Sequence, residues 1–103
     1  MSITMRVLQR YDIRKDAEFH ELERKFAELE RRRPDYRPCR RLRPISGTEP
    51  VNTLVWEGVF ESVEEARAWL AFLDSDREHG ELFVRQVEYF KDVRVEFYEN
   101  LEY

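Results

Sequence analysis

The two ends of the chain share a pattern in which apolar and polar side chains alternate. From Ile3 to Ile13, apolar residues recur on one side of an extended chain, and the pattern returns from Val93 to Leu101. Successive side chains of a strand point to opposite faces, so this period of two predicts a β-strand near each end. The stretches between these strands then decide the fold class.

A helix is predicted from about Asp16 to Arg33. Apolar residues recur there at helical spacing among charged ones, namely Phe19, Leu22, Phe26 and Leu29. Asp16 stands where an N-cap is expected, since its carboxylate can accept a hydrogen bond from a free backbone N–H group. Pro34 ends the helix because proline has no N–H group to donate.

Two extended segments joined by a turn are predicted after this helix. Pro38 and Pro44 bracket a short extended segment around Cys39 to Arg43. The stretch 45–50 collects the turn residues serine, glycine, threonine and proline. Residues 52–60 are rich in β-branched and aromatic side chains, so we expect a strand paired with the short segment.

A second helix is predicted from Ser62, and it is interrupted. Ser62-Val63-Glu64-Glu65 has the form of a capping box. One side of the helix carries apolar residues, namely Val63, Ala66, Trp69, Leu70 and Leu73. The polar run Asp74-Ser75-Asp76 predicts a break, and helical spacing from Leu82 to Phe90 predicts a second piece, with Gly80 leaving its start open.

The order strand, helix, strand, strand, helix, strand predicts one α+β domain over residues 1–103, with a ferredoxin-like β-α-β-β-α-β sandwich and a four-stranded antiparallel sheet. Right-handed crossovers place both helices on the same side of the sheet. One face is therefore covered and the other open. The predicted helix-facing residues are Ile3, Met5, Val7, Tyr11, Leu54, Trp56, Phe60, Val93, Val95 and Phe97.

The predicted open face mixes apolar and charged residues. Its members are Arg6, Leu8, Arg10, Val55, Glu57, Val59, Arg94, Glu96 and Tyr98. A small domain with one uncovered sheet face needs cover, and two-fold pairing is the commonest assembly. We therefore expect a homodimer with this face at its interface, its charges setting the register. The alternative is a solvated face with cross-strand ion pairs.

The strand-to-helix join from Asn52 to Ala66 reads NTLVWEGVFESVEEA. Together with the interrupted second helix, it resembles the NIPSNAP-type members of the dimeric α+β barrel superfamily. That resemblance implies that two ferredoxin-like sheets close against one another in a dimer. It carries no catalytic residue over to this chain.

Aromatic residues could line a pocket between sheet and helices, as in the cofactor-free monooxygenases that share the resembled fold. The candidates are Tyr11, Trp56, Phe60, Trp69, His79 and Phe97. The alternative is that they are ordinary core. Two functions stay open: a non-catalytic dimerising or small-ligand-binding module, and a small cofactor-independent monooxygenase or isomerase acting on an aromatic or apolar substrate.

No motif predicts a cofactor or a metal. There is no glycine-rich phosphate loop, no nucleophile elbow and no His-Glu-x-x-His sequence. Cys39 is the only cysteine, which excludes an internal disulfide. His20 lies among glutamates, and His79 lies near the helix break. Neither histidine has a second ligand at the spacing that a metal site requires.

The net charge of −4 and the pI near 5.3 disfavour nucleic acid as a partner. Arginines gather in residues 31–43, either as a basic helix end followed by a strand or as an anion site. No apolar stretch approaches the ~20 residues of a membrane span, and no signal-peptide core is present. We expect no membrane association and a cytoplasmic location.

Overall fold

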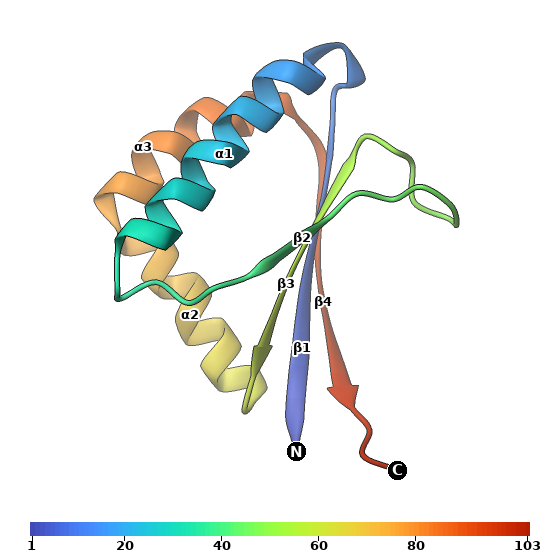
Figure 1. Cartoon of the computed structure of the whole chain (residues 1–103), viewed down its shortest axis with the longest axis vertical. Coiled ribbons are helices and arrows are strands. Elements are labelled where there is room, and N and C mark those ends of the chain that lie inside the picture. Colours follow the sequence, from blue (N-terminus) through green and yellow to red (C-terminus); the bar gives the residue numbers. More distant parts are fainter.

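A computed structural model describes residues 1–103 and has the predicted order of elements (Figure 1). The strands are β1 (Ser2–Tyr11), β2 (Arg40–Leu42), β3 (Thr53–Phe60) and β4 (Phe90–Asn100). The helices are α1 (Asp16–Arg32), α2 (Val63–Ser75) and α3 (Arg77–Gln86), with short 3-10 turns η1 (Ile13–Lys15) and η2 (Val87–Tyr89). None of the helices has both the length and the apolar character needed to cross a bilayer.

The strands form one antiparallel sheet in the order β2-β3-β1-β4. Figure 1 shows α1, α2 and α3 on one side of this sheet. The predicted ferredoxin-like α+β fold class, with its four-stranded antiparallel sheet, is confirmed. So is the break in the second helix, since α2 ends at Ser75 and α3 begins at Arg77.

Several predicted boundaries are wrong, three of them for a reason that the structure shows. Ile13 lies in η1 instead of β1, because Asp12 accepts a hydrogen bond from the Arg14 N–H (3.0 Å) and turns the chain. The N-cap of α1 is Lys15, which makes no side-chain cap, and Asp16 is the first helical residue. Phe90 begins β4 instead of continuing a helix, since it pairs with Tyr11.

Side-chain caps explain how α2 and α3 begin. Ser62 Oγ accepts a hydrogen bond from the Glu65 N–H (3.1 Å), while the Glu65 carboxylate accepts one from the Glu61 N–H (2.6 Å). Asp76 is extended and ends α2. Its carboxylate accepts a bond from the His79 N–H (3.1 Å) and so caps α3.

The strand register confirms the predicted helix-facing side. Val7 pairs with Trp56 on β3 and with Val95 on β4, so these three side chains share one face. The main core under the helices consists of Met5, Val7, Leu29, Tyr36, Trp56, Phe60, Ala66 and Trp69. A second, smaller cluster holds Tyr11, Phe19 and Leu54.

Part of the open face is covered by the chain itself. Leu8 and Val55 are only 6% and 9% exposed although they face away from the helices. Figure 1 shows the connection between β2 and β3 extending on that side. Glu49 of this connection bonds Arg94 on β4, which lies in the same cross-strand row as Leu8 and Val55, so this ion pair joins the connection to the open face beside them.

Candidate functional site

A cavity of about 260 Å³ lies between the sheet and the helices, close to the lower end of the range for small-molecule sites. Its apolar wall consists of Phe26, Tyr36, Trp56 and Phe83 with the aliphatic residues Val7, Leu70, Leu73, Val93 and Val95. Val93 and Val95 are each 45% exposed. Because they and the partly exposed Phe83 both line the cavity and reach solvent, its mouth lies between β4 and α3.

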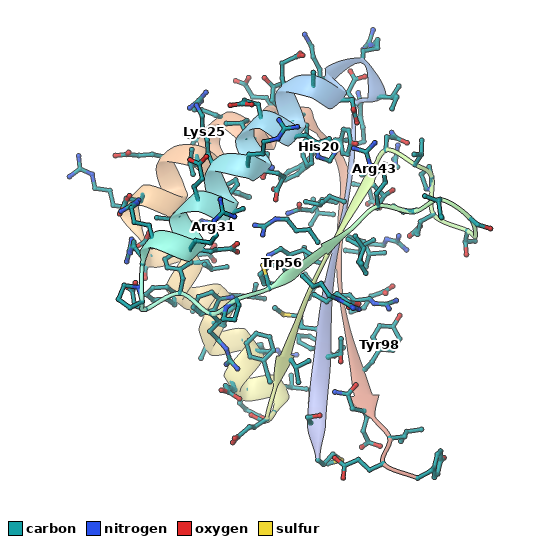
Figure 2. The ribbon with its side chains drawn as sticks, in the orientation of Figure 1. His20, Lys25, Arg31, Arg43, Trp56 and Tyr98 are labelled. Carbon is teal, nitrogen blue, oxygen red and sulfur yellow. The ribbon has the colours of Figure 1, made fainter.

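The predicted pocket residues fall into two groups. Trp56 and His79 line the cavity, and Figure 2 shows Trp56 directed toward the helices. The other four do not line it. Phe60 and Trp69 are part of the main core, Phe97 packs against that core, and Tyr11 belongs to the second cluster.

Arg41 from β2 joins two glutamates of α1 at the cavity wall. Its Nε donates to Glu23 (2.7 Å), and two of its terminal N–H groups donate to Glu30 (2.7 and 3.2 Å). Burial alone lowers the pKa of Arg41, but hydrogen bonding to Glu30 and the charge of Glu23 raise it above its ordinary value. The guanidinium therefore stays charged and holds β2 against α1.

Two more side chains donate hydrogen bonds to these glutamates. Gln86, only 1% exposed, donates from α3 to Glu23 (2.6 Å). The Cys39 thiol donates to Glu30 (2.9 Å), and burial together with this bond raises its pKa well above the ordinary thiol value. A thiol held protonated in this way is a poor nucleophile. We name Glu23, Glu30, Arg41 and Gln86 the polar cluster of the cavity.

His79 contributes a neutral ring to the cavity. The ring lies near Phe26 (centroids 4.9 Å apart) and Phe83 (6.0 Å), and neither ring nitrogen makes a hydrogen bond. Burial lowers the pKa of His79 despite the opposing effect of the Asp76 and Asp74 charges. The imidazole is therefore uncharged at neutral pH and can accept a proton.

The polar cluster was not predicted from the sequence, although a signal for part of it exists. Glu23 and Glu30 each follow an apolar residue of α1 by four positions, Phe19 and Phe26, which places them on the buried stripe. His79 and Gln86 likewise share one side of α3 with Phe83. A charged residue on an apolar stripe can indicate a buried partner, here Arg41.

A second polar group ties the start of α1 to the end of β2. Tyr11 donates to Asp16 (2.5 Å), and His20 lies 2.9 Å from the Tyr11 hydroxyl and 2.7 Å from an Arg43 nitrogen (Figure 2). Burial and the Asp16 bond raise the pKa of Tyr11 to about 12. Burial and Arg43 lower the pKa of His20.

No three His, Cys, Asp or Glu side chains anywhere in the chain form a group that could hold a metal ion.

The arginines of residues 31–43 are engaged within the chain. All except Arg31 have a carboxylate within 4.0 Å. Arg33, for example, bonds both Asp35 and Asp76, and Arg37 bonds Glu65. These carboxylates offset the positive charge that an anion would seek, so the run serves mainly to connect elements.

The part of the open face that stays exposed lies around Val59 and Tyr98, which are 59% and 47% exposed. Figure 2 shows Tyr98 on the side of the sheet away from Trp56. Arg6 lies over the Tyr98 ring (5.4 Å) and also bonds Glu57 (2.7 Å). The strand register places the other residues of the predicted interface on the same open side of the sheet. They are Leu8, Arg10, Val55, Arg94 and Glu96.

The fold and the cavity define a ferredoxin-like α+β domain with an internal site between its two layers. No family model matches the sequence, and no curated protein matches it either. Solved structures do match the fold. A NIPSNAP family protein from Agrobacterium tumefaciens superposes with a TM-score of 0.82 at 12% identity, over 99% of this chain and 88% of that chain.

Two further structures place the chain among related folds. An uncharacterized NIPSNAP domain protein from Burkholderia xenovorans has a TM-score of 0.76 at 20% identity, covering 98% of this chain and 95% of that chain. SnoaB, a cofactor-independent oxygenase from Streptomyces nogalater, has a TM-score of 0.64 at 15% identity, covering 99% and 95%. The predicted resemblance to NIPSNAP-type proteins is confirmed at the level of fold, which by itself assigns no activity.

Proposed function

We propose that this chain is a small-ligand-binding module that binds an aromatic or apolar molecule in the cavity between sheet and helices. The observation that carries the proposal is the cavity itself: an apolar wall that contains four aromatic residues, beside a hydrogen-bonded polar cluster. Apolar pockets with a few fixed polar groups are the usual form of small-molecule sites. The aromatic wall supplies contact area, and the polar cluster orients the ligand.

Filling the mouth of the cavity tests this proposal. Val95→Trp places an indole among residues that line the cavity, and we expect it to weaken binding of a small aromatic ligand at least about tenfold. Isothermal titration with the whole chain measures the change. Val84→Trp is the matched control, since Val84 is an exposed residue of α3 that does not line the cavity. Equal affinity in all three proteins would contradict binding at this site.

The module pairs with a second copy of itself through the open face, as an extension of the same proposal. Val59 and Tyr98 leave apolar area exposed there, beside the cation Arg6 and the anion Glu96. A two-fold axis sets the same patch against itself, so a face that carries both charges can pair cation with anion across the interface. When a second copy binds to this patch, it also covers the part of the sheet that the chain itself leaves open.

Sedimentation measures the pairing. The wild-type chain should sediment as a dimer at micromolar concentration. Val59→Glu should shift it to monomer, because it replaces an apolar contact by a carboxylate that loses its water when the interface closes. Val84→Glu makes the same change on the outer side of α3 and should leave the dimer intact. A monomeric wild type, or a dimeric Val59→Glu variant, would refute the assembly.

The second candidate function is a cofactor-independent monooxygenase or isomerase. The observation that favours it is the neutral, unbonded His79 ring, which lines the cavity and can take a proton from a bound ligand. SnoaB, with a similar fold, is a cofactor-independent oxygenase. Ligand recovered unchanged after incubation in air supports the binding module. Chemical change that disappears in His79→Gln supports the enzyme.

A further inference from the structure

We infer that the cavity selects ligands with an aromatic or apolar body and a hydroxyl or amine group, and that it discriminates against carboxylates. This inference rests on the proposed function, that is, on the cavity binding a small ligand. It adds the chemical class of that ligand, which neither the fold nor the structural relatives supply. The selectivity follows from the charges and the free hydrogen-bond groups on the cavity wall.

The only cation on the cavity wall is already engaged. Arg41 directs its Nε at Glu23 and both terminal nitrogens at Glu30, and one of these also lies 3.5 Å from Cys39 Sγ. A ligand carboxylate binds best to a guanidinium that presents two free parallel N–H groups. Arg41 presents that edge to Glu30, so an incoming carboxylate would have to displace Glu30.

Anionic groups outnumber cationic groups around the cavity. Three carboxylates line it, those of Glu23, Glu30 and Asp74, against the single guanidinium of Arg41. His79 adds no positive charge, because burial lowers its pKa. A ligand anion therefore meets net repulsion, which is stronger in a partly desolvated site than in water. An ammonium group meets attraction from the same residues.

Free acceptors are available to a ligand that donates. The Glu23 oxygens each accept one bond, from Gln86 and from Arg41, and a carboxylate oxygen can accept a second. The donors left on the wall that lack a partner are the Gln9 amide, the His79 ring and the Trp56 indole N–H, and all three are neutral. The four aromatic rings add favourable contacts for a cation as well as for an apolar body.

A matched series of four small ligands tests the selectivity. These are 2-phenylethylamine, 2-phenylethanol, ethylbenzene and 3-phenylpropanoate, which share one ring and differ in the polar group. Binding is followed on the whole chain at neutral pH by NMR titration. We expect the amine and the alcohol to bind more tightly than ethylbenzene, and 3-phenylpropanoate to bind at least about tenfold more weakly than the amine, a difference of about 1.4 kcal/mol.

A charge-removing variant shows whether the cavity causes the preference. Asp74 is exposed at the cavity wall and makes no side-chain hydrogen bond or ion pair, so Asp74→Asn should leave the fold unchanged. We expect it to lower the ratio of amine to propanoate affinity. Glu28→Gln is the control, since it makes the same change in net charge on an exposed residue of α1 outside the cavity. It should leave the ratio unchanged.

The outcomes separate the two proposals. If none of the four compounds shifts the resonances of cavity residues, ethylbenzene included, the proposed function fails. If the compounds bind but 3-phenylpropanoate binds as tightly as the amine, the cavity binds ligands and the selectivity inference is overturned. The selectivity inference is also overturned if Asp74→Asn and Glu28→Gln change the affinity ratio equally, since the preference would then come from net charge alone.

Discussion

Arg41→Ala should lower the free energy of unfolding by about 3–5 kcal/mol, because it leaves two largely buried carboxylates without their cation. The side chains of Glu23 and Glu30 are 8% and 13% exposed, and both are bonded to Arg41. Urea denaturation at neutral pH measures the loss. Since small domains have only about 5–15 kcal/mol in total, a change of this size threatens folding.

Two further variants test the cause of that loss. Arg40→Ala changes the neighbouring residue of β2, whose side chain is 71% exposed and whose partner Glu57 keeps its bond to Arg6. It should cost at most about 1 kcal/mol. Adding Glu23→Gln to Arg41→Ala removes one of the stranded charges and should restore part of the stability. Equal effects of Arg41→Ala and Arg40→Ala would show that the polar cluster is solvated.

Phe60→Ala should also cost about 3–5 kcal/mol, because it removes a large side chain from the main core and leaves a cavity. Phe60 is 3% exposed and belongs to the same core as Met5 and Trp69. The Arg37 guanidinium lies 4.2 Å from its ring centre and covers its outer side. Thermal or urea unfolding of the variant measures the effect.

Phe83→Ala provides the comparison for Phe60. Phe83 lies at the mouth of the cavity and is 38% exposed, so the same truncation should cost clearly less than at Phe60. A Phe60→Ala protein as stable as the wild type would mean that the two faces of β3 have been exchanged. The difference between the two losses of stability therefore shows that Phe60 lies in the core and that Phe83 lies at the open mouth of the cavity.

Much of the fold could be predicted because its signals are local. Alternation in β1 and β4 and helical spacing in α1 depend only on neighbours in the chain. Ser62 was predicted to begin α2 and does so, since a cap needs only the next turn of backbone. The failures are also local in origin. Asp12 turns the chain one residue before the end of the predicted strand, and the pattern of apolar residues carries no sign of that turn.

The candidate site could be predicted only in part. Alternation placed Trp56 on the helix side, but it could not tell a residue that lines a cavity from one that fills the core, such as Phe60. That difference depends on how far α3 lies from β4, a distance set by packing across the whole domain. Val93 and Val95 are exposed in the structure, which shows that α3 does not pack closely over this part of β4.

The sequence by itself determined the order of strands and helices, the interruption of the second helix and the two faces of the sheet. These follow from periodicity and caps, which act over a few residues. Only the tertiary structure decided that Glu23, Glu30, Arg41 and Gln86 meet, because they come from α1, β2 and α3. It alone also decided that Leu8 and Val55 are buried on the open face, beside the bond between Glu49 of the β2–β3 connection and Arg94. A charge pair across elements depends on how the elements dock, and docking is settled by the packing of the whole chain.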